Sequence, residues 1–415
     1  MPVRTKQNIA LNPPSAANGR RDFGLLLAAR VLRAFGFGFS AILIAVYLQA
    51  RNLSPTQIGV VLAVGLLAGS LAGLLSAAAG GRFGRRKTLA VVGLMMTLCG
   101  VDLAFAQQPW LLTLSGLTGM MGVGGSDLGP FLAIEQTVLT QTSDAAGRNR
   151  AFAGYAFTGS LAGAAGAFAA AGATSLARTQ ALFVVFATIG LITAVIPLML
   201  SADVEGQPHV KVFGSFRPLV GLSAIFAVDS LGGGLVVSGL VAYWLHIKFG
   251  ATASVLGPTF GSMSILAALS QAFAGRLADR FGLINTMVFT HLPSNLLLVL
   301  VPFMPNLAWA VGLLVLRSTI ASMDQPPRQA YIVSIVKSHE RSGAIAVTGA
   351  ARGIAQAAGP LITGIAMQTA GLGIPFILGG LIKTCSDLGL YVGFRRRFGP
   401  TENEALAIAA QVSTR

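Results

Sequence analysis

The sequence predicts an all-α integral membrane protein in which twelve transmembrane helices form two six-helix repeats. Three observations predict this fold class: the composition, a series of twelve apolar segments, and an internal repeat. Of the 415 residues, 54% are hydrophobic and only 10% are charged, whereas soluble domains are roughly 25% charged. A water-soluble core does not need that much apolar sequence, so we expect lipid to surround most of the chain.

Twelve apolar segments are each long enough to cross the ~30 Å hydrocarbon core of a bilayer, which requires about 20 residues. The first six lie near residues 24–49, 57–79, 88–106, 110–138, 151–173 and 179–201. The second six lie near residues 218–247, 253–275, 284–304, 307–332, 342–369 and 372–394. They predict five parts: a tail over 1–22, a six-helix bundle over 23–200, a linker over 201–217, a second bundle over 218–395 and a tail over 396–415.

The two halves of the chain repeat one pattern of polar and small residues. Arg33-x-x-Gly36-x-Gly38 in the first segment matches Asp229-x-x-Gly232-x-Gly234 in the seventh, at an offset of 196 positions. Further matches at offsets of 197 or 198 join Asp127-x-x-Pro130 with Asp324-x-x-Pro327, and Gly59 with Gly257. Such a near-constant offset predicts two six-helix units that lie parallel in the membrane.

The positive charges predict how the chain lies in the membrane. Most of the 29 Lys and Arg residues fall in segments on the same side as the termini, whereas the opposite loops hold only Arg51, Arg178 and Lys248. By the positive-inside rule, both termini are expected in the cytoplasm, with the protein in the plasma or inner membrane. The net charge of +15 is then shared among many short loops beside anionic lipid, which accounts for it without a nucleic-acid partner.

The sequence carries no signal for a metal or a cofactor. Its two cysteines, Cys99 and Cys385, lie in apolar segments, and its four histidines are scattered. It has no Gly-x-x-x-x-Gly-Lys-Ser/Thr phosphate loop, and its loops are too short for a soluble catalytic domain. We therefore expect neither an enzyme nor direct use of ATP.

A short charged loop follows the second segment of each half. In the second half it reads Gly-Arg-Leu-Ala-Asp-Arg-Phe-Gly over residues 275–282, and the first-half counterpart keeps Arg-Phe-Gly and a basic tail over residues 82–87. This pattern resembles the signature loop of the major facilitator superfamily of secondary transporters. The resemblance implies that superfamily's fold and a gating role for eight loop residues: Arg82, Gly84, Arg85, Arg86, Gly275, Asp279, Arg280 and Gly282.

The two loops are incomplete in different ways. The first has Gly81 where the superfamily has its acid, and the second has Leu283 and Ile284 in place of the basic tail. In the resembled superfamily, the acid and the arginines of this loop hold neighbouring helix ends together. We therefore expect this contact to be weakened in the first half and stronger in the second, where Asp279 is present.

Arg33 and Asp229 are charged residues at equivalent positions of two transmembrane segments. A helical rise of 1.5 Å per residue places them roughly 16 and 18 Å from the cytoplasmic ends, near mid-membrane. Charges at that depth cost about 2.5–3.5 kcal/mol each on insertion scales, so they should face a partner or a cavity. In the resembled superfamily the first and seventh helices line the central cavity, which implies that the two residues face one another or a shared substrate. They form either a binding or coupling pair, or a fixed ion pair between the halves.

A second charged set lies on the fourth and tenth segments. Asp127 and Asp324 each stand three residues before a proline, and Arg328 follows Asp324 at i+4 on the same helix face. The prolines at 326–327 remove two backbone donors and should bend or break the tenth helix. Asp127, Asp324 and Arg328 are assigned to an inner gate, or else to a salt bridge that locks cytoplasmic helix ends. Glu135, farther along the fourth segment, is expected at the cytoplasmic interface.

Arg317 and Arg352 lie at mid-membrane depth on the tenth and eleventh segments. A planar guanidinium binds carboxylate or phosphate through two parallel hydrogen bonds, so both residues are candidate anchors for an anionic or zwitterionic substrate. The alternative is pairing with Asp229 or another intramembrane acid. Four residues on segments that are peripheral in the resembled superfamily are assigned structural roles: Asp102, His291, Lys383 and Asp387. Among these, Lys383 and Asp387 are expected to neutralise each other at i and i+4.

These features predict a carrier that moves a small solute by alternating access, driven by a proton or solute gradient and without a cofactor. Gly359-Pro360 loosely resembles the glycine-proline motif of the superfamily's antiporters, which favours antiport weakly over symport. Efflux is slightly favoured over uptake. The expected partners are the small-molecule substrate, protons and the lipid bilayer, and the expected state is a monomer. The alternatives are a membrane receptor or sensor on the same scaffold, and a facilitative uniporter or channel.

Overall fold

The computed structural model describes residues 16–124, 130–142, 148–205, 217–334 and 341–394, and this part of the chain contains α-helices and short 3-10 turns but no β-strand. Fifteen α-helices make up the twelve expected segments, because the fourth, seventh and tenth segments are each divided in two. The predicted all-α membrane architecture of twelve segments in two repeats is therefore confirmed.

The helices occur in the following order along the chain. The first half contains α1 (Ala16–Ala50), α2 (Pro55–Phe83), α3 (Arg85–Phe105), α4 (Pro109–Leu117), α5 (Pro130–Thr142), α6 (Arg148–Ala169), η1 (Ala170–Gly172), α7 (Leu176–Val195), η2 (Ile196–Met199) and η3 (Ala202–Val204). The second half contains α8 (Arg217–Gly234), α9 (Ser238–Phe249), α10 (Ala253–Phe281), α11 (Leu283–Leu300), η4 (Val301–Phe303), α12 (Leu307–Ser318), α13 (Gln325–Ser334), α14 (Arg341–Thr369) and α15 (Ile374–Phe394).

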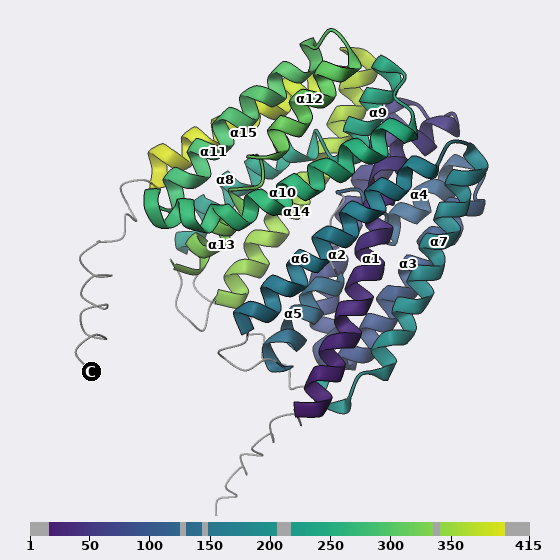
Figure 1. Cartoon of the computed structure of the whole chain (residues 1–415), viewed down its shortest axis with the longest axis vertical. Helices are drawn as coiled ribbons and strands as arrows, with labels where there is room; N and C mark the ends of the chain where they lie inside the picture. Colours follow the sequence, from purple (N-terminus) through teal and green to yellow (C-terminus); the bar gives the residue numbers. More distant parts are fainter. Residues whose placement is uncertain (1–15, 125–129, 143–147, 206–216, 335–340, 395–415) are drawn as a thin grey trace, which may run out of the picture.

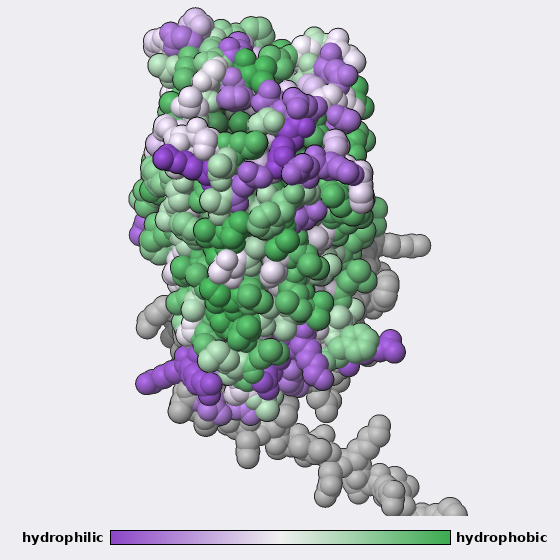
Figure 2. Space-filling view, turned by 90° about the vertical axis from the view of Figure 1, so that its right-hand side faces the viewer, coloured by the Kyte–Doolittle hydropathy of each residue, from purple (hydrophilic) through white to green (hydrophobic). Residues whose placement is uncertain are grey.

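The surface of the described helices is suited to lipid. Among the described residues, eight helical spans are long and apolar enough to cross a membrane, with α8 and α9 counted as one span. Large apolar side chains on them are exposed, among them Leu98 on α3, Phe289 on α11 and Leu381 on α15. On the face shown in Figure 2, hydrophobic residues form a broad belt with hydrophilic residues above and below it. Exposed apolar surface of this extent is stable against hydrocarbon and not against water, so we identify the belt as the lipid contact.

Equivalent glycines bring equivalent helices into backbone contact inside each half. A Cβ atom on Gly38 of α1 would lie 2.9 Å from the carbonyl carbon of Gly163 on α6. A Cβ atom on Gly234 of α8 would lie 3.1 Å from the Cα atom of Gly359 on α14. Membrane helices that cross this closely need small residues at the contact. Both members of the first pair recur 196 positions later in the second, so the sequence repeat is also a repeat of packing.

Repeat-equivalent glycines also bring the two halves into close contact, on both sides of the boundary between them. A Cβ atom on Gly59 of α2 would lie 3.1 Å from the Cα atom of Gly364 on α14. On the other side of the molecule, a Cβ atom on Gly257 of α10 would lie 2.7 Å from the backbone nitrogen of Ala171, just after α6. Gly59 and Gly257 are the repeat equivalents found in the sequence. The halves therefore meet along two smooth seams, α2 with α14 and α10 with α6.

The apolar core joins the two halves at one end of the molecule. We call the end where α1 begins and α15 ends the terminal end, and the other the opposite end (Figure 1). At the opposite end, Tyr47 of α1 and Trp244 of α9 belong to one continuous buried cluster. At the terminal end the second half has a separate apolar cluster, which includes Phe226, Met287 and Leu390. Within the described residues, the halves are thus packed together at the opposite end and keep separate cores at the terminal end.

The predicted break in the tenth segment is confirmed. Helix α12 ends at Ser318 and α13 begins at Gln325. The prolines at 326–327 lie in the first turn of α13, where a missing N–H removes no helical hydrogen bond. The helix is therefore interrupted about two turns before the prolines rather than bent at them.

The seventh and fourth segments, expected as continuous helices, are interrupted as well. In the seventh, the Thr363 hydroxyl of α14 donates a hydrogen bond of 2.8 Å to the Leu235 carbonyl, just after α8 ends. That bond satisfies a backbone group that the break leaves without a helical partner. In the fourth, Gly119 and Gly122 follow the end of α4 with φ angles of 69° and 70°, a conformation that favours glycine.

Candidate functional site

Each half contains a buried cluster of charged side chains. The first-half cluster consists of Arg30 and Arg33 on α1, Phe131 and Glu135 on α5, and Tyr155 on α6. The second-half cluster consists of Asp229 and Ser230 on α8, His291 and Asn295 on α11, Asp324 and Arg328 at the start of α13, and Lys383 and Asp387 on α15. We take these two clusters as the candidate functional site.

The first-half cluster is centred on the carboxylate of Glu135. The Arg33 Nη2 donates to Glu135 Oε2 at 2.6 Å, and both side chains are only 1% exposed. The Tyr155 hydroxyl donates to the same oxygen. The Arg33 guanidinium also lies 4.0 Å from the centre of the Phe131 ring, and Arg30 lies 5.0 Å from that of Tyr155. Helices α1, α5 and α6 are therefore tied together by one buried acid.

The expectation that Glu135 lies at the cytoplasmic interface is wrong. Its depth was derived from a continuous helical rise, whereas the structure interrupts the fourth segment between Leu117 and Pro130. Glu135 follows the break, on α5, and its 1% exposed carboxylate is bonded to Arg33 inside the first bundle. Asp127 falls between α4 and α5 and lies outside the described residues.

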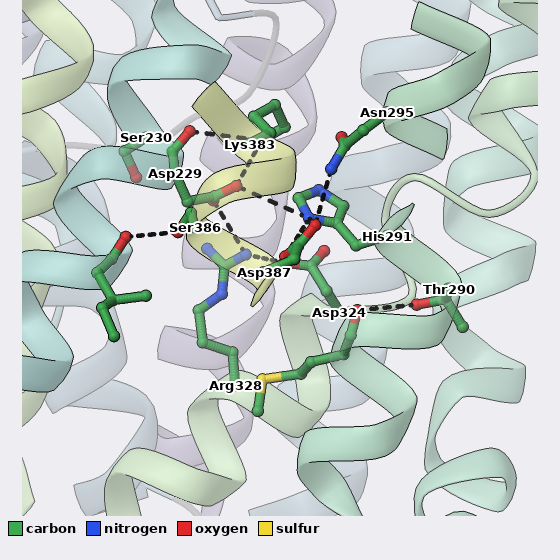
Figure 3. A network of polar contacts seen from close by, with 12 residues as sticks. Asp229, Ser230, Thr290, His291, Asn295, Asp324, Arg328, Lys383, Ser386 and Asp387 are labelled. Atoms are coloured by element: carbon green, nitrogen blue, oxygen red, sulfur yellow. Dashed lines mark hydrogen bonds and ion pairs between the residues drawn. The ribbon is translucent and has the colours of Figure 1, made fainter. Parts of the chain in front are cut away.

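The second-half cluster is centred on the carboxylate of Asp229. Lys383 Nζ lies 2.7 Å from Asp229 Oδ1, and Arg328 Nη2 lies 3.3 Å from Asp229 Oδ2. His291 Nδ1 lies 3.7 Å from Asp229 Oδ1. Figure 3 shows these side chains converging on Asp229 from three neighbouring helices, α11, α13 and α15. One buried acid thus joins four helices of the second half.

His291 connects Asp229 to a second acid, Asp387. His291 Nδ1 lies 3.0 Å from both carboxylate oxygens of Asp387, and the Asn295 amide donates to Asp387 Oδ2 at 2.7 Å. The predicted neutralisation of Lys383 by Asp387 is therefore wrong. Although both residues lie on one face of α15, Lys383 extends to α8 and Asp387 to α11.

Arg33 and Asp229 do not pair with one another. They occupy equivalent positions, as the repeat predicts, but Arg33 is bound by Glu135 of its own half and Asp229 by Lys383 of its own half. The expected contact between the two residues is wrong, and so is the alternative of a fixed ion pair between the halves. In each bundle the opposite charge comes from a later helix of the same bundle, Glu135 of α5 in the first and Lys383 of α15 in the second. These two positions are not equivalent in the repeat.

Asp324 and Arg328 form the predicted i, i+4 ion pair. Their side chains are 5% and 7% exposed, and Arg328 continues to Asp229. The pair is consequently part of the buried cluster and not a salt bridge at an exposed helix end. A small cavity beside it is lined by residues of α8, α11, α13 and α15, among them Asp229, Asp324, Arg328 and Asp387.

Arg317 and Arg352 have no acid partner in the described part of the chain. Arg352 Nε on α14 donates to the Ser230 hydroxyl at 3.0 Å. Arg317 on α12 makes no hydrogen bond or ion pair with a described residue, and its Nε is buried without an acceptor. The predicted alternative, pairing with Asp229, is not realised because Lys383 and Arg328 already contact that carboxylate.

The first signature loop holds the linker between the halves. The Glu205 carboxylate accepts hydrogen bonds from the backbone N–H groups of Arg85 at 2.5 Å and Arg86 at 3.1 Å, at the N-terminus of α3. The Arg85 side chain donates to the Val204 carbonyl at 2.9 Å, and that of Arg86 donates to the carbonyls of Pro197 and Leu198 in η2. Glu205 thus replaces the acid that the loop lacks at Gly81.

Gly84 permits this contact. Its φ angle of 96° is one that favours glycine, and a Cβ atom there would lie 3.0 Å from Glu205 Oε2. Arg82, next to it, is exposed and has its guanidinium over the Phe83 ring. Gly84 therefore serves both the turn between α2 and α3 and the approach of the linker carboxylate.

The second signature loop has no such contact. Asp279 and Arg280 are exposed, and neither forms a hydrogen bond or ion pair with a described residue. Gly275 has open space around it, and Gly282 forms the turn into α11 with a φ angle of 84°. The expectation that Asp279 makes the stronger contact is wrong in this conformation. The acid that engages a signature loop comes from the linker, a source that comparing the two loops cannot show.

Replacing Glu205 with Ala is expected to destabilise the protein by about 1 kcal/mol, the usual cost of losing a side chain that accepts from N–H groups at a helix N-terminus. Thermal unfolding of the purified protein in detergent measures the effect. Asp279→Ala is the matched control, because it also removes an acid beside a signature loop but breaks no contact in the structure. Equal destabilisation by both variants would show that the hydrogen bonds of Glu205 to the first signature loop do not contribute to the stability of the protein.

Several of the clustered residues were assigned other roles from the sequence. Glu135, His291, Lys383 and Asp387 are all ionisable residues within apolar segments, which is itself a signal of a functional or paired position. The sequence does not show which of these residues pair with which, because the partners are separated by 92 to 154 positions. Asp102, assigned a structural role, lies on α3 and is hydrogen-bonded to Ser115 of α4. Among the described residues, no group of three His, Cys, Asp or Glu side chains is arranged to hold a metal ion.

Comparison with known sequences identifies a family. The sequence profile described as "Major Facilitator Superfamily" matches residues 26–229 and 222–407. A protein of Saccharomyces cerevisiae named "Uncharacterized membrane protein YJR124C" is 25% identical over 415 aligned positions, which cover 89% of this chain and 93% of that protein.

Comparison with solved structures gives the same fold. A bacterial homologue of the human lysosomal transporter Spinster, in an inward-facing and occupied conformation, superposes with a TM-score of 0.75 at 14% identity over 92% of this chain and 99% of that one. A mutant form of the nucleoside transporter NupG superposes with a TM-score of 0.73 at 14% sequence identity, over 90% of this chain and 99% of that one. The inward-open xylose transporter XylE of E. coli superposes with a TM-score of 0.71 at 14% sequence identity, over 94% of this chain and 99% of that one. At these identities the likeness establishes the fold alone.

Proposed function

This chain belongs to the Major Facilitator Superfamily, and on that premise we propose that it is a secondary active transporter that moves a small solute across the membrane by alternating access. The observation that carries the proposal is the arrangement of the two bundles. Each bundle has its own buried charge cluster, and small residues line both seams between the bundles. Such bundles can rock against one another as units around a site near mid-membrane.

The conformation of the described residues fits one state of that cycle. The core is continuous between the halves at the opposite end and separate at the terminal end. With the termini in the cytoplasm, as the distribution of positive charge supports, this is a state closed to the outside. The proposed location is the plasma or inner membrane, with the protein acting as a monomer.

We assign proton coupling to the two central carboxylates, Asp229 and Glu135. Each is bonded to basic groups on other helices of its bundle, so that protonation would weaken the contacts holding those helices. Asp324 and Arg328, next to Asp229, would then move with α13 and act at the inner gate. Gly359 packs against α8 and Pro360 against α2, so helix packing is enough to explain why these two residues occur here. The preference for antiport and efflux rests only on the loose resemblance to an antiporter motif.

Counterflow in proteoliposomes tests the proposal. Vesicles are loaded with an unlabelled mixture of organic anions, nucleosides, sugars and dipeptides and are then exposed to the same compounds in isotope-labelled form. A carrier is expected to concentrate at least one labelled compound transiently and saturably inside. A receptor or sensor would bind without exchange, and a channel would equilibrate the label without transient accumulation. Either of those two outcomes would contradict the proposal.

A further inference from the structure

Positive charge exceeds negative charge in and around the second-half cluster. The described basic residues are Arg317, Arg328, Arg352 and Lys383, and the acids are Asp229, Asp324 and Asp387. Two of these acids contact Arg328, one of them together with Lys383, and the third is bonded to His291 and Asn295. All three acids are thus engaged, while Arg317 and Arg352 are left without a carboxylate.

Arg317 is the more unusual of the two. It lies in the last turn of α12, directly before the interruption of the tenth segment. Its side chain is half-buried and its Nε is fully buried without an acceptor. Asp229 attracts it electrostatically but is not within ion-pair distance. A cation held in a membrane interior without an anion costs free energy, so its presence there calls for a partner that the described chain does not supply.

Arg352 has only a neutral partner. Its Nε donates to the hydroxyl of Ser230, the residue after Asp229, at 3.0 Å. Like Arg317, it is half-buried and is attracted by the charge of Asp229. The bond through Nε positions the guanidinium and leaves its two terminal nitrogens for another acceptor.

Arg352 also lies where the two halves meet. The next residue, Gly353, faces α2 of the first half, and a Cβ atom on it would lie 3.0 Å from the Cβ atom of Ser70. Substrate sites of carriers with this type of repeat lie near mid-membrane at the boundary between the repeats. Both arginines without acid partners therefore lie within the electrostatic reach of Asp229, and Arg352 lies on a helix that borders this boundary.

We propose that Arg317 and Arg352, positioned with the help of Ser230, bind an oxyanion of the transported solute, a carboxylate or a phosphate group. This inference rests on the proposed transport function and names the substrate class. The planar guanidinium offers paired N–H donors that match either oxyanion. A solute of this class supplies the missing negative charge, whereas a cationic solute would add to the excess positive charge.

Binding by the purified full-length protein in a neutral detergent tests the assignment. Thermal unfolding is measured at constant ionic strength with sodium phosphate, lactate or succinate, and with glucose or choline chloride as neutral and cationic probes. At least one of the three anions is expected to raise the unfolding temperature by about 4 °C when it exceeds its Kd about 100-fold. Phosphate and the two carboxylates, tested separately, show which oxyanion is bound.

Three variants connect the binding to the site. Arg317→Gln and Arg352→Gln are each expected to weaken anion binding at least tenfold, and Arg317→Lys, which keeps the charge without the paired donors, is expected to weaken it less than Arg317→Gln. Arg276→Gln is the matched control, because it removes an exposed arginine that is not among the assigned gating or binding residues and is expected to leave binding unchanged. The unfolding temperature without ligand shows that each variant is folded before its binding is read.

The inference is overturned if glucose or choline stabilises the protein as much as the anions do, or if folded Arg317→Gln and Arg352→Gln bind the anion with parental affinity. Its failure is distinct from that of the transport proposal. Counterflow of a neutral or cationic solute, unaffected by both variants, would overturn the oxyanion site and leave the carrier intact. Anion binding that needs both arginines, without any counterflow, would contradict the carrier instead.

Discussion

Replacing Asp229 with Asn is expected to lower the free energy of unfolding by about 3–5 kcal/mol, the usual cost of removing one partner from a buried ion pair. Asn keeps the size of the side chain but removes the charge. Lys383, 2.7 Å away, and Arg328, 3.3 Å away, would then remain buried without that carboxylate. Thermal and denaturant unfolding in detergent measure the loss. The variant is also expected to stop accumulation of the solute in response to a pH gradient, while counterflow continues in the folded fraction.

Two comparisons separate the loss of charge from general damage. Combining Asp229→Asn with Lys383→Met removes an acid and a base together, and it is expected to restore most of the stability because no unmatched lysine remains. Asp279→Asn changes an exposed acid and should have little effect. Parental stability of Asp229→Asn would show that the second-half cluster does not hold α8, α13 and α15 together. Unchanged accumulation driven by the pH gradient would remove Asp229 as a coupling group.

Replacing Glu135 with Ala is expected to cost a similar amount, about 3–5 kcal/mol, in the other bundle. The Arg33–Glu135 contact is 2.6 Å long between side chains that are 1% exposed, and the Tyr155 hydroxyl donates to the same carboxylate. Glu135→Gln should cost less, because the amide oxygen can still accept from Tyr155. Unfolding measurements on the two single variants give the order.

The double variant Arg33→Met with Glu135→Leu provides the matched test. It replaces the ion pair with apolar side chains of similar size, a change that is often neutral in protein interiors. We expect it to be more stable than Glu135→Ala. If Glu135→Ala and Glu135→Gln were both as stable as the parent protein, the first-half cluster would not be a structural unit of its bundle.

The architecture could be predicted because it depends on properties that are local in sequence. Segment length and apolar content determine where helices cross the membrane, and the offset near 197 showed that one six-helix unit occurs twice. Even the contacts that carry the repeat, such as Gly38 with Gly163 and Gly234 with Gly359, lie at equivalent positions in both halves.

The pairing inside the candidate site could not be predicted, because it depends on where the repeat fails. Arg33 and Asp229 are equivalent positions, but position 135 has no equivalent acid: the residue 197 positions later is Ile332. Each half has therefore acquired its own countercharge, Glu135 on α5 in one and Lys383 on α15 in the other.

The interruptions of the membrane helices could be predicted only in part. The fourth, seventh and tenth segments are each interrupted, and only the interruption of the tenth was expected. The prolines at 326–327 signalled one of these breaks. Three consecutive glycines at 232–234 stand directly before the break in the seventh segment, but glycine is tolerated inside membrane helices and does not by itself predict a break. That break is stabilised by Thr363 of α14, a contact that only the packed structure contains.

The account as a whole depends on the two bundles moving against one another while each stays intact. Thr56 of α2 and Gln368 of α14 lie on opposite sides of the boundary at the opposite end, where the Thr56 N–H donates to the Gln368 side chain at 3.2 Å. Cysteines at these two positions, in a chain with Cys99 and Cys385 replaced by Ala, can be bridged by a short bis-methanethiosulfonate, which forms a reducible disulfide with each thiol. The control pair replaces Lys248 and Pro302, which are in contact within the second half at the same end.

The most direct measurement is counterflow before and after bridging. The account predicts that bridging Thr56→Cys with Gln368→Cys stops solute exchange and that reduction of the bridge restores it. Bridging Lys248→Cys with Pro302→Cys, which joins two parts of one bundle, is predicted to leave exchange intact. Exchange that continues at the parental rate with the two halves bridged would contradict alternating access by relative motion of the bundles.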